Sequence, residues 1–271
     1  MNQNVLPKVK SQQLMLDKIL TLFEYRMFPY LMDHIPFETV KKAEFNDNLI
    51  ELQKSIYYLD ATLESAWEVD HEQRHRLWND IVKDVKTCLP MGVLPQTVLR
   101  HIEKYEKHEL NIRENKWPNR LKMSYFYFYK SCDVKLLRYL IYEFGELTKV
   151  FGSLSKWRDF DFVTEVNDDI TDLNEDLYCY NGNRFLIQLL MNGKSHTFRE
   201  FDDFLQGLLE KTKVEIDKTK PDSFDYVLAT NTWLKCTNTI DQLNRTIENL
   251  DLKRLTKESF LEPYILKPYK F

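Results

Sequence analysis

The chain alternates long amphipathic segments with short polar breaks. Apolar residues recur every three or four positions over most of the 271 residues, which is the period of an α-helix with one buried face. Hardly any stretch alternates apolar and polar residues as a half-buried strand does. Prolines and capping residues mark where the helical pattern starts and stops. The pattern predicts helices over residues 10–30, 46–69, 72–89, 95–115, 119–151, 159–178, 184–190, 198–218 and 222–248.

Composition agrees with an all-α fold. The chain has only six Gly and nine Pro, and no Gly/Ser-rich or Pro-rich linker divides it, so we expect a single domain over residues 1–271. It contains no run of 18 apolar residues and no signal-peptide pattern, which predicts a cytoplasmic protein without stable membrane insertion. The four cysteines are far apart in the sequence and are expected to be free thiols. A net charge of −4 gives no electrostatic footprint for a nucleic-acid partner.

The most informative polar stretch is the acidic segment, residues 166–176. Asn167, Thr171 and Glu175 are spaced at i, i+4 and i+8, so a helix would align their oxygen atoms in one stripe. Asp169 points about 160° away from that stripe. A second stripe, one residue further along, consists of Asp168, Asp172 and Asp176. Apolar and aromatic residues flank the segment, so its carboxylates are expected to need a cation, and oxygen ligands without Cys or His suit Mg²⁺.

The pattern Asn167-Asp168-x-x-Thr171-x-x-x-Glu175 resembles the second metal-binding motif of class I terpene synthases and matches it at every defined position. The resemblance implies a single-domain, all-α helical bundle around a central cavity. It also implies that Mg²⁺, as three ions, is bound by acidic helices that face each other across that cavity.

Overlapping spacings resemble two related families of the same fold. Asp168-Asp169-x-x-Asp172 is similar to the aspartate-rich motif of trans-prenyl diphosphate synthases. Asp172-x-x-x-Asp176 is similar to the second motif of squalene and phytoene synthases. The fold expectation is therefore the same for all three families, whereas the reaction is left open between them.

The resemblance requires a second acidic helix, and Asp60 with Glu64 is the best candidate. The pair resembles the Asp-x-x-x-Asp form of the first motif in squalene and phytoene synthases, with Glu in place of the second Asp. Asp60 and Glu64 are therefore expected to be metal ligands together with Asn167, Thr171 and Glu175, and Asp168 and Asp172 take that role in the alternative register.

A diphosphate leaving group also needs cationic partners. Lys130 follows five consecutive aromatic residues and precedes the acidic segment, where the superfamily carries a diphosphate-binding Arg or Lys, so it is the first candidate. Arg120 and Arg138 are the alternatives on the same segment. Arg245 lies where terpene synthases carry an Arg-Tyr pair, although the Tyr is missing, and Lys267 in the C-terminal tail is its rival. We expect Lys130 and Arg245 to act on the diphosphate.

Aromatic residues make up 14% of the chain and surround the expected ligands. Such rings stabilise carbocations through their faces, and Tyr57 and Phe128 are expected to line the substrate cavity, although core packing explains any single ring as well. The sequence therefore predicts a Mg²⁺-dependent lyase of isoprenoid biosynthesis, a terpene synthase that ionises a linear prenyl diphosphate. A chain-elongating or squalene-synthase-like prenyltransferase and a catalytically inactive helical scaffold are the alternatives, and a homodimer is left open.

Overall fold

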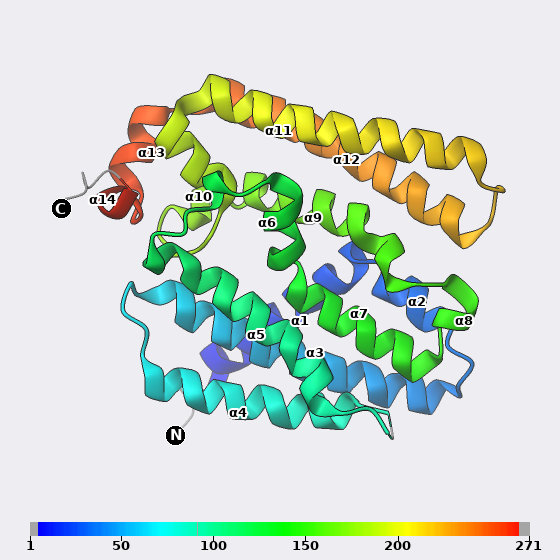
Figure 1. Ribbon diagram of the computed structural model, residues 1–271. Helices are drawn as coiled ribbons and strands as arrows, with labels where there is room; N and C mark the ends of the chain where they lie inside the picture. The colour runs from blue at the N-terminus through cyan, green and yellow to red at the C-terminus, as the bar shows by residue number, and fades with distance from the viewer. Residues whose placement is uncertain (1–4, 91, 266–271) are drawn as a thin grey trace. The chain divides into compact units, whose positions relative to one another are not determined.

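The predicted all-α fold is confirmed. The computed structural model describes residues 5–90 and 92–265, and within these ranges all regular elements are helices (Figure 1). None of the helices in the described ranges is long and apolar enough to cross a membrane. The α-helices of the first half are α1 (Val5–Tyr25), α2 (Phe28–Asp33), α3 (Thr39–Ser65), α4 (His71–Cys88), α5 (Pro95–Leu110), α6 (Met123–Lys130) and α7 (Cys132–Gly145). Those of the second half are α8 (Thr148–Phe151), α9 (Arg158–Thr171), α10 (Leu173–Asp176), α11 (Arg184–Lys218), α12 (Phe224–Asn249), α13 (Leu252–Glu258) and α14 (Glu262–Ile265).

The chain forms two compact units, each assembled from segments that are separate in the sequence. The first unit comprises residues 1–62, 69–103 and 133–152, and the second comprises residues 63–68, 104–132 and 153–271. Short 3₁₀ turns at Asn111–Glu114, Pro118–Arg120 and Leu154–Trp157 belong to the second unit. The predictions of a single domain and of a central cavity remain predictions.

In the first unit, α3 contacts both α7 and α4. The rings of Phe45 on α3 and Phe144 on α7 stack at 3.9 Å. Ser55 on α3 donates a 2.6 Å hydrogen bond to Asp84 on α4, which joins the polar margins of these two helices. Asp70 caps the N-terminus of α4 by accepting hydrogen bonds from the first-turn amides, which explains why this helix begins at His71.

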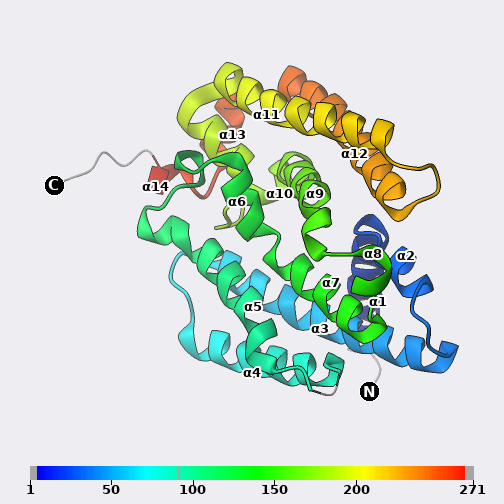
Figure 2. The ribbon, with the colours of Figure 1, turned by 45° about the vertical axis from the view of Figure 1, so that its right-hand side comes forward.

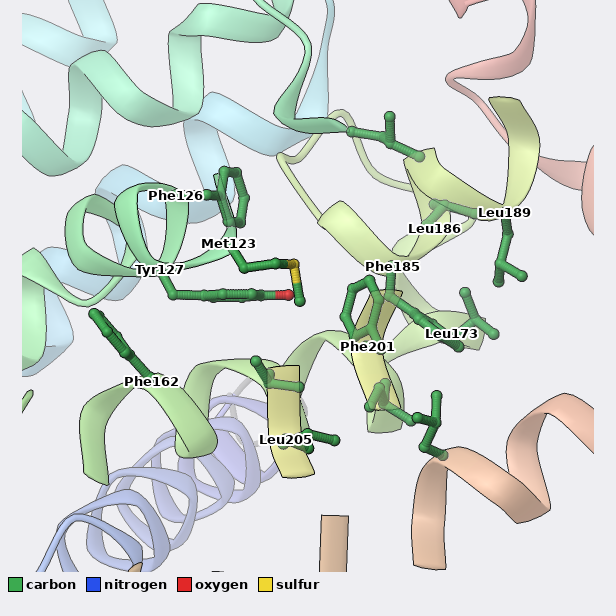
Figure 3. Packing of buried hydrophobic residues seen from close by; sticks show 14 of the residues in the cluster. Met123, Phe126, Tyr127, Phe162, Leu173, Phe185, Leu186, Leu189, Phe201 and Leu205 are labelled. Atoms are coloured by element: carbon green, nitrogen blue, oxygen red, sulfur yellow. The ribbon is translucent and has the colours of Figure 1, made fainter. Parts of the chain in front are cut away.

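The core of the second unit lies between α6, α9, α11 and α12. The long helices α11 and α12 run side by side in both ribbon views (Figures 1 and 2), and both contact α9. Figure 3 shows Met123, Phe126 and Tyr127 extending from α6 toward side chains of α9 and α11, among them Phe162 and Phe185. Phe126 and Tyr127, two of the five consecutive aromatic residues, thus pack one face of α6 against the core of the second unit.

The observed helix breaks differ from the predicted ones where single residues leave the helical conformation. The predicted segment 10–30 divides at Met27, which is left-handed with φ 60° and precedes a helix with Pro29 in its first turn. Residues 119–151 form three helices instead of one. The predicted gap between 190 and 198 narrows to a kink at Gly193 with φ 73°, a backbone angle that glycine tolerates readily.

Candidate functional site

The acidic segment lies at the C-terminal end of α9 and continues into α10. Asp172, at φ −88° and ψ 5°, ends α9 and precedes α10. The backbone amides of Asp172 and Asp176 nevertheless donate to carbonyls four residues earlier, at 2.9 and 2.8 Å, so the chain keeps an almost helical path. The predicted single helix is therefore interrupted at one residue only.

The residues of the first stripe are held partly by their own helix. The Thr171 hydroxyl donates hydrogen bonds to backbone carbonyls of the preceding turn, including the carbonyl of Asn167 at 3.0 Å. The Oδ1 atom of Asn167 accepts a 3.3 Å hydrogen bond from Thr239 of α12. Thr171 and Glu175 are exposed and Asn167 is half-buried, so this stripe runs from the margin of α12 into solvent.

The second stripe is only partly open to solvent. Asp172 is exposed, whereas Asp168 and Asp176 are half-buried. In the part of the chain that the structure describes, no three Asp, Glu, His or Cys side chains are close enough to hold a metal ion by themselves. Any ion bound here would thus take further ligands from water or from the substrate.

Asp169 has a different environment, because its side chain is fully buried on the opposite side of α9. One carboxylate oxygen accepts hydrogen bonds from the Tyr127 hydroxyl at 2.8 Å and from the Arg184 backbone amide at 2.9 Å. The other carboxylate oxygen is paired with the ammonium group of Lys130. Asp169 therefore joins α6, α9 and the N-terminus of α11, where a negative charge is favoured by the helix dipole.

Asn183 connects this buried pair to the end of the acidic segment. Its amide nitrogen donates to the Asp169 carbonyl at 2.8 Å and to Asp176 Oδ2 at 2.6 Å. Its Oδ1 atom caps α11 by accepting the Leu186 amide at 2.8 Å. We name Tyr127, Lys130, Asp169, Asp176 and Asn183 the buried polar cluster.

The cluster shifts the protonation of its members. The pKa of Lys130 is well above its ordinary value, because the carboxylate of Asp169 and, next, that of Glu109 outweigh the lowering effect of burial. Burial, and then the negative charge of Asp169, raise the pKa of Tyr127 well above its usual range. Lys130 is thus a permanent cation whose charge is used inside the protein.

Two further groups at the cluster have displaced pKa values. Burial raises the pKa of Asp176 to about 6, although Lys130 and Asn183 lower it in part. Burial and the nearby Lys130 lower the pKa of His108 to about 3. The His108 ring is 6% exposed, packs 4.5 Å from the Phe126 ring, and has no hydrogen-bond partner for Nε2 among the described residues. His108 is therefore neutral in the folded protein at neutral pH.

Arg245 lies on the wall of a surface pocket of about 450 Å³ beside the acidic segment. The pocket is formed by α10, α12, α13 and the turns between them, and Arg254 of α13 provides a second guanidinium group. Arg254 donates to Glu258 at 3.0 Å, and Tyr178 donates to the other oxygen of that carboxylate at 2.7 Å. We call this hollow the Arg245 pocket. Sequence reasoning missed Arg254, because α13 carries no motif and was not predicted as a helix.

The remaining predicted residues are divided between the units. Asp60, Tyr57 and Arg138 belong to the first unit, where Asp60 and Tyr57 are half-buried on α3 and Arg138 is buried with its guanidinium 5.7 Å from the Phe28 ring. Glu64 and Phe128 belong to the second unit.

Glu64 lies near the continuation of the acidic segment. Its carbonyl accepts a 2.9 Å hydrogen bond from the Tyr180 amide, four residues beyond Asp176. Arg113 donates to the carbonyls of Ala66 and Trp67 at 2.9 Å and thereby holds this end of α3. The main chain at Glu64 thus contacts a residue that follows the acidic segment. Phe128 is exposed on α6, and Lys267 lies outside the described residues.

No family model, curated protein or solved structure matches this chain. Any function must therefore be argued from the chemistry of its own residues.

Proposed function

We propose that the second unit binds a prenyl diphosphate in the Arg245 pocket and, with Mg²⁺ at the acidic segment, ionises it as a class I terpene synthase does. The observation that carries this proposal is that Arg245 and α10 line one hollow. Arg245, the proposed diphosphate-binding cation, lines the same hollow as Leu173 and Asn174 of the acidic segment.

The cationic side of the pocket suits a diphosphate. Arg245 presents a planar fork of N–H donors, which matches phosphate oxygens better than an ammonium group does, and Arg254 adds the N–H groups that its bond to Glu258 leaves over. Gln242, Thr246 and Asn174 add neutral polar groups to the lining. Preorganised donors of this kind favour the charge that develops on a departing diphosphate.

The apolar side of the pocket suits an isoprenoid chain. Four leucines line the hollow, and none of them carries a nucleophile that would trap a carbocation: Leu173, Leu177, Leu250 and Leu255. Burying part of a hydrocarbon chain against them contributes about 25 cal/mol for each Å² of apolar surface removed from water. The lining of the pocket therefore combines charged and apolar side chains, as an amphiphilic diphosphate requires.

The donor set of the acidic segment fits Mg²⁺. Its candidate ligands are oxygen atoms of Asn167, Asp168, Thr171, Asp172 and Glu175, all exposed or half-buried. Mg²⁺ commonly binds one or two carboxylates and completes its shell with water and substrate phosphates, so a closed cluster of protein ligands is not required. Bound there, the metal would neutralise charge on the leaving diphosphate. Asp168 and Asp172 are the ligands if the prenyltransferase register applies.

The experiment is turnover of C10, C15 and C20 prenyl diphosphates by the full chain with Mg²⁺, with and without isopentenyl diphosphate. We expect release of diphosphate together with a hydrocarbon or alcohol, detected by gas chromatography. Arg245→Gln should lower turnover at least tenfold. Arg199→Gln, an exposed arginine on α11 outside the pocket, is the matched control and should leave turnover unchanged.

The other outcomes decide between the alternatives. A longer diphosphate formed only with isopentenyl diphosphate identifies a chain-elongating prenyltransferase, and a head-to-head product identifies a squalene-synthase-like enzyme. Absence of both turnover and prenyl diphosphate binding at millimolar Mg²⁺ overturns the proposal in favour of a helical scaffold.

A further inference from the structure

Helix α6 carries aromatic residues on both of its sides. Phe126 and Tyr127 are buried and face the core of the second unit (Figure 3). Tyr125, Phe128 and Tyr129 occupy positions i, i+3 and i+4 and therefore share the other side. Tyr125 is 53% exposed and Phe128 is 41% exposed. Core packing thus explains only two of the five aromatic residues in this helix.

The three outer rings form one continuous cluster. The centroids of Tyr125 and Tyr129 are 4.8 Å apart, and those of Phe128 and Tyr129 are 5.5 Å apart. Single exposed apolar residues are common on soluble proteins, whereas adjoining ones commonly mark an interaction site. We call Tyr125, Phe128 and Tyr129 the aromatic face of α6.

A basic stretch leads directly into this face. Residues 115–130 contain four Lys or Arg and no Asp or Glu, in a chain whose net charge is −4. Lys130 is used inside the buried polar cluster, and Lys116 pairs with Glu114. Arg120 and Lys122 are both exposed to solvent just before α6. The aromatic face is therefore bordered by positive charge within a protein that is acidic as a whole.

We propose that the aromatic face of α6, together with Arg120 and Lys122, docks the protein on an anionic lipid surface. Tyr and Phe rings partition into the interfacial region of a bilayer, where the ring is apolar and the Tyr hydroxyl remains hydrated. Exposed Arg and Lys beside such rings are attracted to anionic headgroups. This docking is peripheral and does not depend on the proposed prenyl diphosphate chemistry.

The geometry of the rings favours lipid over nucleic acid. Bases bind proteins by stacking on open aromatic faces. The Tyr125 and Tyr129 rings are inclined at 55° to each other, and the Phe128 and Tyr129 rings are inclined at 82°. The edge of one ring therefore contacts its neighbour, and the rings are not stacked in parallel. Phe128 also offers no hydrogen-bonding group. Such a packed cluster fits the headgroup region better than it fits separated bases.

The test is sedimentation of the full chain with vesicles of phosphatidylcholine alone or with phosphatidylglycerol added. We expect binding to the anionic vesicles that weakens as salt is raised. Tyr125→Ser with Phe128→Ser should lower the partition coefficient at least tenfold. Arg120→Gln with Lys122→Gln should lower it by about fivefold for each charge removed.

Two matched variants serve as controls. Tyr58→Ser with Val40→Ser removes comparably exposed apolar side chains from α3, and Lys213→Gln with Lys218→Gln removes two exposed charges from α11. Both should bind vesicles as the unchanged protein does, and circular dichroism should show the same helicity for all variants.

Several results would overturn the proposal. Equal binding to neutral and anionic vesicles, no binding at all, or an equal loss in the control variants would each exclude an anionic-lipid surface at α6. A change of oligomeric state in the Tyr125/Phe128 variant would instead make this side of α6 an interface between copies of the chain. If the Tyr125/Phe128 variant lost binding to RNA but kept its binding to vesicles, the aromatic face of α6 would be a nucleic-acid surface instead.

Discussion

The buried polar cluster and the Arg245 pocket both contain cations next to the acidic segment, but they use those cations differently. Lys130 faces Asp169, which is fully buried, and its charge is neutralised within the protein. Arg245 is exposed on the wall of an open hollow. Positive charge that is already paired in the interior stabilises the fold, whereas positive charge at an open surface remains able to bind an anion.

The free-energy cost of removing a charge from water explains why a charge in the buried polar cluster affects stability, whereas a charge in the Arg245 pocket remains able to bind an anion. Removing one member of a buried ion pair leaves an uncompensated charge, which destabilises a protein by about 3–5 kcal/mol. Exposed charges are screened by water, and losing one changes stability by only about 0–1 kcal/mol. Measurements of stability and of ligand binding should therefore separate the two regions.

The largest effect is expected for Asp169→Ala. The change leaves the Lys130 ammonium and the Tyr127 hydroxyl without their buried acceptor and removes a bond to the start of α11. We expect the free energy of unfolding to fall by about 3–5 kcal/mol, measured by urea denaturation followed by circular dichroism.

The double variant Asp169→Ala/Lys130→Met provides the control. It also removes the Lys130 charge that Asp169→Ala leaves unpaired, so it should recover part of the lost stability. The coupling energy between the two changes should therefore be opposite in sign to the two single losses of stability. If Asp169→Ala costs less than about 1 kcal/mol, the cluster does not hold the second unit together.

A second comparison concerns pH, because two groups of the same region titrate with opposite effects. His108 has a folded pKa of about 3, below its ordinary 6.5, so the unfolded chain binds more protons and stability is lost as pH falls below 6.5. Asp176 has a folded pKa of about 6, above its ordinary 3.8, so its contribution to stability falls as pH rises from 3.8 to 6.

The variants His108→Gln and Asp176→Asn should each reveal one of the two opposite pH dependences of the free energy of unfolding between pH 5 and 6.5. The His108 contribution over this interval is about 1.6 kcal/mol, because the slope reaches its full 1.36 kcal/mol for each pH unit only well below the unfolded pKa. Relative to the unchanged protein, His108→Gln should lose less stability on acidification, and Asp176→Asn should lose more. Urea denaturation at several pH values measures both differences, and parallel curves for all three proteins would contradict the assigned pKa shifts.

The sequence was sufficient for the fold class, since a 3.6-residue period over most of the chain leaves little alternative to helices. It was insufficient for some helix ends, which depend on single backbone angles. Met27 becomes left-handed between α1 and α2, and Asp172 interrupts the acidic helix. Neither Met nor Asp marks a break by itself, although Pro29 signals the start of α2.

The candidate site was predicted unevenly for a related reason. Spacing alone placed Asn167 and Thr171 on a side of α9 away from Asp169, and the structure puts Asp169 in the core and Thr171 in solvent. Spacing could not tell which side is buried, because both carry acids. The pairing of Lys130 with Asp169 and the position of Arg254 depend on helices far apart in the sequence. A pattern along one segment contains no information on such contacts.

The smallest effect on stability, and the sharpest on binding, is expected on the open side of α9. Asn167→Ala and Glu175→Ala remove exposed or half-buried groups and should each change the free energy of unfolding by less than about 1 kcal/mol.

The unchanged protein should melt at a higher temperature when millimolar Mg²⁺ and pyrophosphate are added, because a ligand of the folded state stabilises it. In the terpene-synthase register both variants lose this increase, together with turnover, while Asp168→Asn and Asp172→Asn keep part of it. In the prenyl-synthase register the dependence is reversed, with Asp168 and Asp172 essential and Asn167 dispensable. If all four variants melt and turn over as the unchanged protein does, the acidic segment is not the metal site, and the contrast between the two sides of α9 concerns stability alone.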